Sequence, residues 1–232
     1  MLTVHHLENS RSQRILWLLE ELGVDYAIKR YARDPLTSLA PPELTAVHPL
    51  GKSPVVTDGE RTIAESGAIV EFLLDHHGAG RLRPPAGSAA FDQYRYWLHF
   101  SEGSFMPLMV MSLIFNRVAT AKMPFFAKPI ARSIVGKVRQ SYIDPNTRRA
   151  LDFMETSLSA TGWFAGGELS AADIQMSFPV EAAAVRSGLG EHYPNLQSFL
   201  DRIHSRPAYQ AALEKGGPYA LLGGQANSSA TS

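Results

Sequence analysis

Apolar positions at the start of the chain follow two different periods. Residues 2–7 form a short β-prone run, and leucine and isoleucine then recur at helical spacing from Ile15 to Leu22, where Gly23 stops the pattern. Residues 24–31 alternate apolar and polar side chains, as a half-buried strand does. The pattern predicts β-α-β, and a right-handed crossover makes the two strands parallel.

The residues that follow predict a short helix, a hairpin and a longer helix. After a proline-rich loop, residues 41–49 can hold a short helix that ends at a proline. Two β-prone runs flank Asp58-Gly59, which is a strong signal for a two-residue hairpin turn. Residues 66–77 then place apolar side chains on one side of a helix. We therefore expect residues 1–79 to form an α/β domain with the order β-α-β-α-β-β-α.

The chain changes character after this first domain. Residues 80–88 are rich in glycine and proline and lack periodicity, which is typical of a linker. Residues 89–215 contain long helical patterns and no convincing alternating strand, so we expect an all-α, helical-bundle domain. Residues 216–232 are small and polar, and we expect this C-terminal tail to be partly disordered.

Charge is balanced over the whole chain but not along it. Lys+Arg and Asp+Glu both number 22, so we expect neither nucleic acid nor an anionic membrane as a partner. Between Arg117 and Arg149, however, eight basic residues accompany one acid, Asp144. Such a run is either a solvated helix face or a surface that attracts anionic ligands.

Cysteine is absent, which excludes disulfides within the chain, thiolate zinc sites and any cysteine nucleophile of the protein's own. If sulfur chemistry occurs here, the sulfur comes with a ligand. The first residues show no targeting pattern, and no run reaches the roughly 18 apolar residues of a membrane span. We expect a cytoplasmic protein.

Two short motifs lie where a strand and a helix are predicted to begin. Ser53-Pro54 opens a predicted strand, where the peptide bond is compatible with the cis form; the alternative is an ordinary trans proline at the strand edge. Ser66 begins a predicted helix, whose free N–H groups bind a carboxylate, and Glu65 offers the opposite charge for an ammonium group. The alternative for this pair is a helix cap with an acidic neighbour.

The stretch HPLGKSPVV, followed by IAESGAIVEFL and then by an all-helical half, resembles the glutathione S-transferase superfamily, and in particular its serine-type cytosolic members from bacteria. The resemblance covers about residues 2–215. It implies a thioredoxin-like N-terminal domain that holds glutathione and a helical domain that supplies most of the pocket for an electrophilic second substrate. The resemblance also implies a homodimer.

The resemblance assigns glutathione-binding roles residue by residue. The proline would be cis, the backbone of the serine before it would pair with the cysteinyl part of glutathione, and the Glu-Ser pair would hold the γ-glutamyl group. A lysine would bind the glycyl carboxylate, with a histidine as a weaker candidate. The residues concerned are Lys52, Ser53, Pro54, Glu65, Ser66 and His48.

Catalysis requires a group that lowers the pKa of the glutathione thiol, which is about 8.5 for a free cysteine thiol. In the family's serine-type classes, the activating serine lies four residues before an arginine of the first helix, and these positions correspond to Ser10 and Arg14. Ser12 is the second candidate, although it can instead be the helix N-cap. The positive charge of Arg11 is a third way to stabilise the thiolate. Tyrosine-type activation is disfavoured, because the first strand carries histidines where those classes have a tyrosine.

The second-substrate pocket is expected at the first long helix of the C-terminal domain. The candidates, which lie in a stretch rich in Met and Phe, are Phe105, Met106, Met109 and Phe115. Such a stripe is also what a plain helix core looks like. Residues 123–126, of sequence MPFF, suggest a pocket lip or a dimer contact. Ser170 and Asp173 form a capping-box-like pattern that resembles a folding motif of the family, so we assign Asp173 to stability.

The expected function is conjugation of the glutathione thiolate to small hydrophobic electrophiles, with glutathione as a co-substrate and with no metal or redox cofactor. A glutathione-dependent peroxidase or disulfide reductase is the alternative enzyme. A non-catalytic relative that binds ligands or partners is a third interpretation.

Overall fold

The N-terminal part of the chain folds around a four-stranded sheet. The computed structural model describes residues 1–221. In chain order, the elements of this part are β1 (Thr3–Leu7), α1 (Gln13–Leu22), β2 (Ala27–Tyr31), α2 (Pro42–Thr45), β3 (Val55–Asp58), β4 (Arg61–Ala64) and α3 (Ser66–His77). The strand order is β2-β1-β3-β4. The expected order of elements, β-α-β-α-β-β-α, is confirmed.

Strand pairing follows the local signals in the sequence. β1 and β2 are parallel, from the pair Thr3 and Ala27 onward, as the crossover predicts. β3 pairs with β1 and with β4 in the antiparallel sense, and Asp58 faces Arg61 across the predicted hairpin turn. Gly23 ends α1 with a left-handed backbone (φ 62°), a conformation that glycine adopts without steric penalty. These turns fix which strands become neighbours.

Helices make up the rest of the described chain. They are α4 (Ala89–Phe100), the π-helical turn η1 (Ser101–Phe105), α5 (Met106–Thr120), α6 (Ala127–Val138), the π-helical turn η2 (Arg139–Ile143), α7 (Asp144–Leu158), α8 (Ala171–Ser187), α9 (Pro194–His204) and α10 (Pro207–Gly216). Residues 78–221 contain no strand. The expected all-α second part is confirmed.

Two π-helical turns interrupt otherwise continuous helices. The run α4–η1–α5 and the run α6–η2–α7 each carry a proline just after the wide turn, Pro107 and Pro145. Proline has no N–H to donate to the carbonyl four residues earlier, so the regular bonding pattern cannot continue there. Such turns often occur at functional sites, and η1 contains Glu102, a residue of the site described below.

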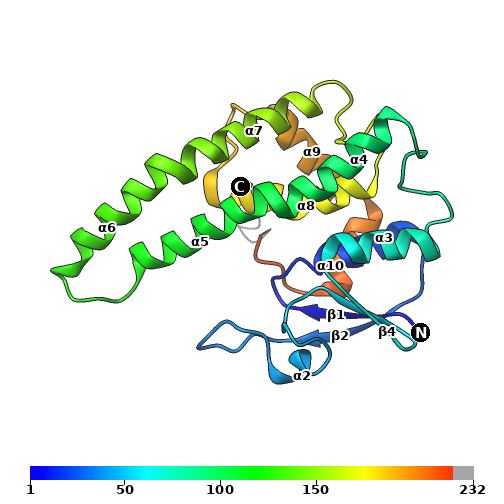
Figure 1. Cartoon of the computed structure of the whole chain (residues 1–232), viewed down its shortest axis with the longest axis horizontal. Helices are drawn as coiled ribbons and strands as arrows, with labels where there is room; N and C mark the ends of the chain where they lie inside the picture. Colours follow the sequence, from blue (N-terminus) through cyan, green and yellow to red (C-terminus); the bar gives the residue numbers. More distant parts are fainter. Residues whose placement is uncertain (222–232) are drawn as a thin grey trace, which may run out of the picture.

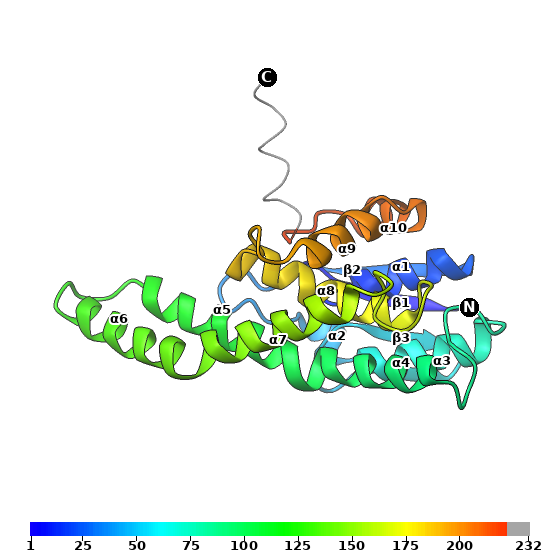
Figure 2. The same cartoon turned by 90° about the horizontal axis from the view of Figure 1, so that it is seen from above.

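Helix α1 connects the sheet to the helical part. Eight of its ten residues are buried, among them Trp17 and Leu18, because the helix is covered on more than one side. α10 lies beside it (Figure 2), and α8 and α3 also contact it. Continuous burial of this kind makes unpaired polar groups of α1 costly. Arg14 finds partners inside the protein, whereas Nε2 of Gln13 has no hydrogen-bond partner among the described residues.

The capping box at the start of α8 is present. Asp173 is fully buried and accepts hydrogen bonds from the backbone N–H groups of Phe164 (2.7 Å) and Ser170 (2.8 Å) and from the Ser170 hydroxyl (2.9 Å). Burial raises the pKa of Asp173 to about 6, although these hydrogen bonds act in the opposite direction. The carboxylate therefore joins the loop before α8 to the helix itself.

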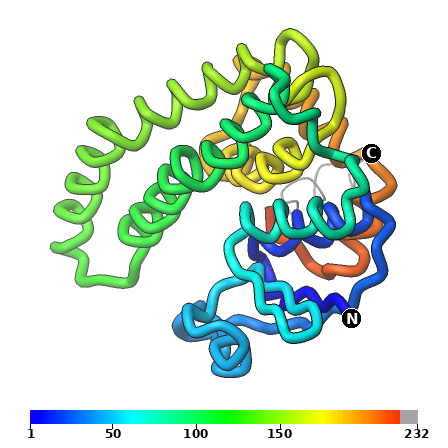
Figure 3. Tube along the Cα trace, turned by 45° about the vertical axis from the view of Figure 1, so that its right-hand side comes forward, coloured from blue at the N-terminus to red at the C-terminus, as the bar shows by residue number. Residues whose placement is uncertain are grey.

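Helices α5 and α6 project from the body as an antiparallel pair (Figures 1 and 3). We call residues 106–138 the arm.

The C-terminal tail is predicted to begin at residue 216. Tyr219 donates a hydrogen bond to the buried Glu181 (2.6 Å), and the N–H of Ala220 donates to Asn9 (2.7 Å). Residues 222–232 lie outside the described residues.

Candidate functional site

The loop between β1 and α1 holds Ser10 in a chain of hydrogen bonds. The Ser10 hydroxyl lies 2.7 Å from the Ser12 hydroxyl and donates to the Ser53 hydroxyl at 3.3 Å. Ser53 in turn donates to the carbonyl of His5 (2.9 Å) and accepts from the N–H of Leu7 (3.2 Å). The side chain of Ser53 thus anchors the segment 52–54 to the end of β1. The sequence predicted a role only for its backbone.

Ser12 faces the interior of the protein. It is the N-cap residue of α1, as the sequence allowed, but its side chain makes no capping hydrogen bond. The hydroxyl instead lies 2.8 Å from Nδ1 of His6, and no part of Ser12 is exposed. Two inward-facing partners, His6 and Ser10, hold it there.

His6 is neutral at physiological pH. Burial, followed by the positive charge of Arg30, lowers its pKa to about 4, while a hydrogen bond with the backbone of Gly216 acts in the opposite direction. Because that bond favours the protonated ring, we assign the ring N–H to the Gly216 side and let Nδ1 accept the Ser12 proton. The Ser12 hydroxyl then donates its hydrogen bond to His6. Ser10 is the serine whose hydroxyl can donate a hydrogen bond to a ligand.

A cleft beside this loop contains every residue predicted to bind glutathione. It is a narrow cleft of about 50 Å³, lined by Arg11, His48, Leu50, Lys52, Ser53, Pro54, Ala64, Glu65 and Ser66. The Ser53-Pro54 peptide bond is cis, as predicted. Glu65 is the N-cap residue of α3, with φ 70°, and Ser66 is the first residue of that helix. The cleft therefore combines cationic groups with an acid beside a helix N-terminus.

Glu102 joins the two parts of the protein at this cleft. Its carboxylate forms ion pairs with Arg11 and with the buried Arg14. Arg14 also donates to the carbonyl of Gln175 (2.6 Å). Burial of Glu102 opposes its ionisation, but the charges of both arginines outweigh it and lower its pKa. Sequence reasoning missed Glu102, although an acid inside an apolar helical run was a usable signal.

The predicted second-substrate residues divide into two groups. Phe105, Met106 and Met109 are buried in the main hydrophobic core, so in this structure they pack helices together, which agrees with the alternative interpretation of the stripe. Phe115 is half-buried. The apolar side chains that α5 exposes are Val110, Ile114 and Val118, which recur every four residues and so share one side of the helix.

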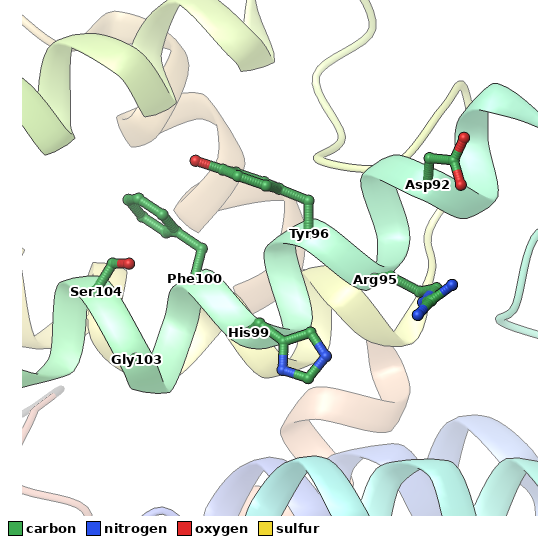
Figure 4. A pocket seen from close by; sticks show the side chains of 7 residues that line it. All are labelled: Asp92, Arg95, Tyr96, His99, Phe100, Gly103 and Ser104. Atoms are coloured by element: carbon green, nitrogen blue, oxygen red, sulfur yellow. The ribbon is translucent and has the colours of Figure 1, made fainter.

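Two further hollows lie along α4. One of about 570 Å³ separates α3 from α4; Glu65 belongs both to it and to the cleft, and Glu102 and Gln175 also line it. The other is a groove over α4 and η1, lined by Asp92, Arg95, Tyr96, His99, Phe100, Gly103 and Ser104, none of which was predicted as a site residue. Figure 4 shows Tyr96 and Phe100 on one side of the helix and Arg95 and His99 on another. Within residues 1–221, no group of three His, Asp or Glu side chains could hold a metal ion.

Comparison with protein families finds two matches. Residues 1–75 match the model described as glutathione S-transferase, N-terminal domain. Residues 119–207 match the model described as glutathione S-transferase, C-terminal domain.

Individual proteins resemble the chain over most of its length. Glutathione S-transferase 3 of Schizosaccharomyces pombe is 38% identical over 215 residues, which is 93% of this chain and 88% of that protein. The disulfide-bond oxidoreductase YfcG of Escherichia coli is 27% identical over 93% of this chain and 95% of that protein. Among solved structures, a glutathione S-transferase from Actinobacillus pleuropneumoniae has a TM-score of 0.73 and 34% identity, and 95% of each chain is covered.

Proposed function

Because the chain belongs to the glutathione S-transferase family, we propose that it joins the thiol of glutathione to small hydrophobic electrophiles. The observation that carries this proposal is the position of the Ser10 hydroxyl. It lies at the start of α1, bonded to Ser53, and Ser53 lines the cleft that contains all the predicted glutathione-binding residues. Glutathione acts as a co-substrate, and the reaction needs no metal or redox cofactor.

Ser10 stabilises the glutathione thiolate. Its proton turns from Ser53 or Ser12 to the sulfur, while the Ser12 hydroxyl keeps donating its hydrogen bond to Nδ1 of His6. A hydrogen bond to a charged acceptor contributes about 1.5–3 kcal/mol, and the N-terminus of α1 adds about 0.3–1 kcal/mol. Together they can lower the thiol pKa by about two units, which corresponds to roughly 2.7 kcal/mol. The thiol proton leaves to solvent, and the thiolate attacks the electrophile, forming a carbon–sulfur bond as the leaving group departs with its electron pair.

Arg11 is a weaker candidate than Ser10 for this role. Its guanidinium lines the cleft but is paired with Glu102, which offsets its charge. We propose that this ion pair positions the loop, whereas Lys52 binds the glycyl carboxylate and Glu65 and Ser66 bind the γ-glutamyl group. His48, at the edge of the same cleft, is a secondary contact.

The electrophile lies against α5. The exposed stripe of α5 consists of Val110, Ile114 and Val118 and begins two turns after Glu102. The carboxylate of Glu102 pairs with Arg11 in the loop between β1 and α1. Arg117 on α5 lies near Arg33 of the N-terminal part. Burial is the main cause of the lowered pKa of Arg33, and the positive charge of Arg117 lowers it further. An apolar surface facing the N-terminal part suits an apolar electrophile. Phe115, half-buried on the same helix, is the predicted pocket residue that retains some exposure.

A second candidate function is reduction of mixed disulfides. The support for it is the similarity to YfcG, which is named a disulfide-bond oxidoreductase. The same glutathione thiolate would attack one sulfur of the disulfide and release the other as a thiolate. Since the chain has no cysteine, a further glutathione molecule would have to resolve the product. A peroxidase would use the same thiolate against an O–O bond.

We also propose that the enzyme is a cytoplasmic homodimer. Tyr96, Phe100 and Phe153 form an aromatic cluster whose ring centroids are 5.7–6.1 Å apart, and Tyr96 and Phe153 remain exposed. Two hollows that share Phe100 and Ser104 flank this cluster. An aromatic surface of this kind is typical of a protein interface. Sedimentation equilibrium should give a dimer, and Tyr96→Glu should give a monomer; a monomeric wild type would refute this part.

The function is tested by calorimetry and by an activity panel. Glutathione should bind the wild type, and Glu65→Gln should weaken binding through loss of the ammonium contact. Activity toward an aryl halide, an organic hydroperoxide and a mixed disulfide should favour the aryl halide and should survive exhaustive treatment with a chelator. Absence of glutathione binding would refute the enzyme, and a preference for the disulfide would replace conjugation by reduction.

A further inference from the structure

The arm is the most basic part of the chain and contains no acid. Its cations are Arg117, Lys122, Lys128, Arg132 and Lys137, and the acid-free run extends from residue 103 to residue 143. The rest of the chain holds 17 basic and 22 acidic residues, a net charge of −5. The protein is therefore polarised, with a cationic arm on an anionic body. The balanced total charge, on which the expectation of no membrane partner was based, conceals this separation.

The cations of the arm are exposed and are not used inside the protein. Within residues 1–221, no carboxylate lies within ion-pair distance of Lys122, Lys128, Arg132 or Lys137. Arg139, just beyond the arm, shows the contrast, because it bonds to Asn116 (2.7 Å) and pairs with Asp144 (3.1 Å). The unpaired positive charge of the arm therefore lies toward its tip and along α6.

The tip and α6 also expose large apolar side chains. Phe125 is 85% exposed, Phe126 is 66% exposed, and their rings meet edge to face with centroids 5.7 Å apart. Ile130 and Ile134, one and two turns further along α6, are exposed on the same side of the helix as Phe126. Only Val135 of α6 is buried. An apolar stripe of this size, left open at the end of a projecting hairpin, indicates an interaction surface.

We propose that the arm docks on an anionic membrane surface, with Phe125 and Phe126 inserted among the lipid chains. An interfacial helix combines lysine and arginine with an apolar face. α6 supplies Lys128, Arg132 and Lys137 together with Ile130 and Ile134, and Phe126 is its N-cap residue. The charge separation favours the arm as the point of contact, because an anionic surface attracts the arm and repels the body.

The contact is peripheral. The continuous helix Ala89–Thr120 is long and apolar enough to cross a membrane by length and composition, and 39% of its most apolar window is buried inside the protein. Its first half packs against α8 and carries the buried Trp97, so this half cannot leave the core without unfolding it. Only the distal arm is free to enter the lipid.

Sedimentation with vesicles tests the proposal on the full chain, without glutathione, so that its outcome does not depend on the proposed enzyme activity. Wild-type protein should sediment with vesicles that contain about one third phosphatidylglycerol and stay in solution with pure phosphatidylcholine. Phe125→Ser/Phe126→Ser and Lys122→Glu/Lys128→Glu should each lower partitioning by more than about tenfold, and salt should weaken wild-type binding.

Matched control variants change similar side chains outside the arm. Leu36→Ser/Leu39→Ser removes two exposed apolar groups from the N-terminal part, where the side chains are 93% and 66% exposed. Lys29→Glu/Arg148→Glu reverses two exposed charges outside the arm. Both should bind vesicles as the wild type does. Circular dichroism should show that all four variants are folded.

Insertion is read separately by fluorescence. The chain's three tryptophans, Trp17, Trp97 and Trp163, lie outside the arm, so Phe125→Trp adds a reporter at the tip. The emission spectrum of Phe125→Trp minus that of the wild type should shift to the blue with anionic vesicles only. The proposal is overturned if the wild type does not bind anionic vesicles, or if Phe125→Ser/Phe126→Ser binds them as the wild type does. It is also overturned if the arm variants change the oligomeric state and not the vesicle binding, which would make the arm a contact between copies of the chain.

Discussion

The proposed glutathione side and the proposed electrophile side of the candidate site are built from different kinds of contact. On the glutathione side, hydrogen bonds of 2.7–3.3 Å link Ser10, Ser12, Ser53 and His6, and the residues that would touch the ligand come from a few short motifs. On the electrophile side, α5 buries its Phe and Met side chains and exposes Val110 and Ile114. Polar recognition depends on individual atoms, whereas the apolar wall depends on which side of a helix the core covers.

The largest effect should come from Phe105, which separates the two interpretations of the Met and Phe stripe. Phe105 is fully buried, and its ring stacks on that of Phe100 with centroids 6.3 Å apart. Phe105→Ala should lower the free energy of unfolding by about 3–5 kcal/mol, measured by urea denaturation, because it leaves a cavity. The half-buried Phe115→Ala should lower it by less. If Phe105→Ala kept its stability but bound the electrophile poorly, the residue would belong to the pocket after all.

The buried histidine should make stability depend on pH. The pKa of His6 is about 4 in the folded protein and about 6.5 unfolded. Its contribution is therefore complete above pH 6.5 and is lost as the pH falls toward 4, by up to about 3 kcal/mol. Asp173, whose pKa is raised to about 6, changes stability in the opposite direction over this pH range. Its contribution to stability is present below pH 3.8 and is lost as the pH rises through 6.

A difference measurement separates these two groups. His6→Asn keeps an acceptor near the position of Nδ1 but cannot be protonated. The stability of the wild type minus that of His6→Asn, followed from pH 7 to pH 4, should fall with a slope approaching 1.4 kcal/mol per pH unit. A flat difference would mean that His6 has the same pKa in the folded and unfolded states, so that burial does not keep its ring neutral.

Ser10→Ala tests the polar half of the comparison. It should lower kcat/KM for conjugation by about 10- to 100-fold, because the thiolate loses a hydrogen bond of about 1.5–3 kcal/mol. The pH–rate profile should shift upward by one to two units, as expected for a thiol pKa that returns toward about 8.5. Ser12→Ala is the matched control, and its profile should shift less. A full shift in Ser12→Ala, or in Arg11→Ala, would move the catalytic assignment to that residue.

Much of the fold and of the glutathione cleft could be predicted, because the relevant signals are local. Gly23 and Asp58-Gly59 set an end and a turn from one or two residues, and both lie where expected. The predicted glutathione-binding residues of the cleft fall in two stretches of the N-terminal part, so short motifs identify them.

The rest of the site depends on contacts between distant parts of the chain. Arg11 and Glu102 are 91 positions apart, and nothing near either residue reveals the pair. The hydroxyl of Ser12 satisfies a buried histidine six residues earlier instead of a helix N–H, a choice that depends on how deeply α1 is buried. The side of α5 that becomes core is determined by its contacts with α8 and α6. Periodicity alone therefore could not distinguish the exposed stripe of α5 from its buried side.

The smallest effect should come from the exposed stripe on α5, where a ligand would cover only part of each side chain. Ile114→Ala should raise KM for an apolar electrophile by about fivefold, since it removes roughly 1 kcal/mol of apolar contact. KM for glutathione and the free energy of unfolding should stay near their wild-type values. Ile134→Ala on α6 is the matched control, because the two isoleucines are exposed to similar extents, 52% and 56%, and lie on different helices of the arm. Measured without vesicles, this control should leave both KM values unchanged; equal effects of the two substitutions would mean that the electrophile does not distinguish α5 from α6.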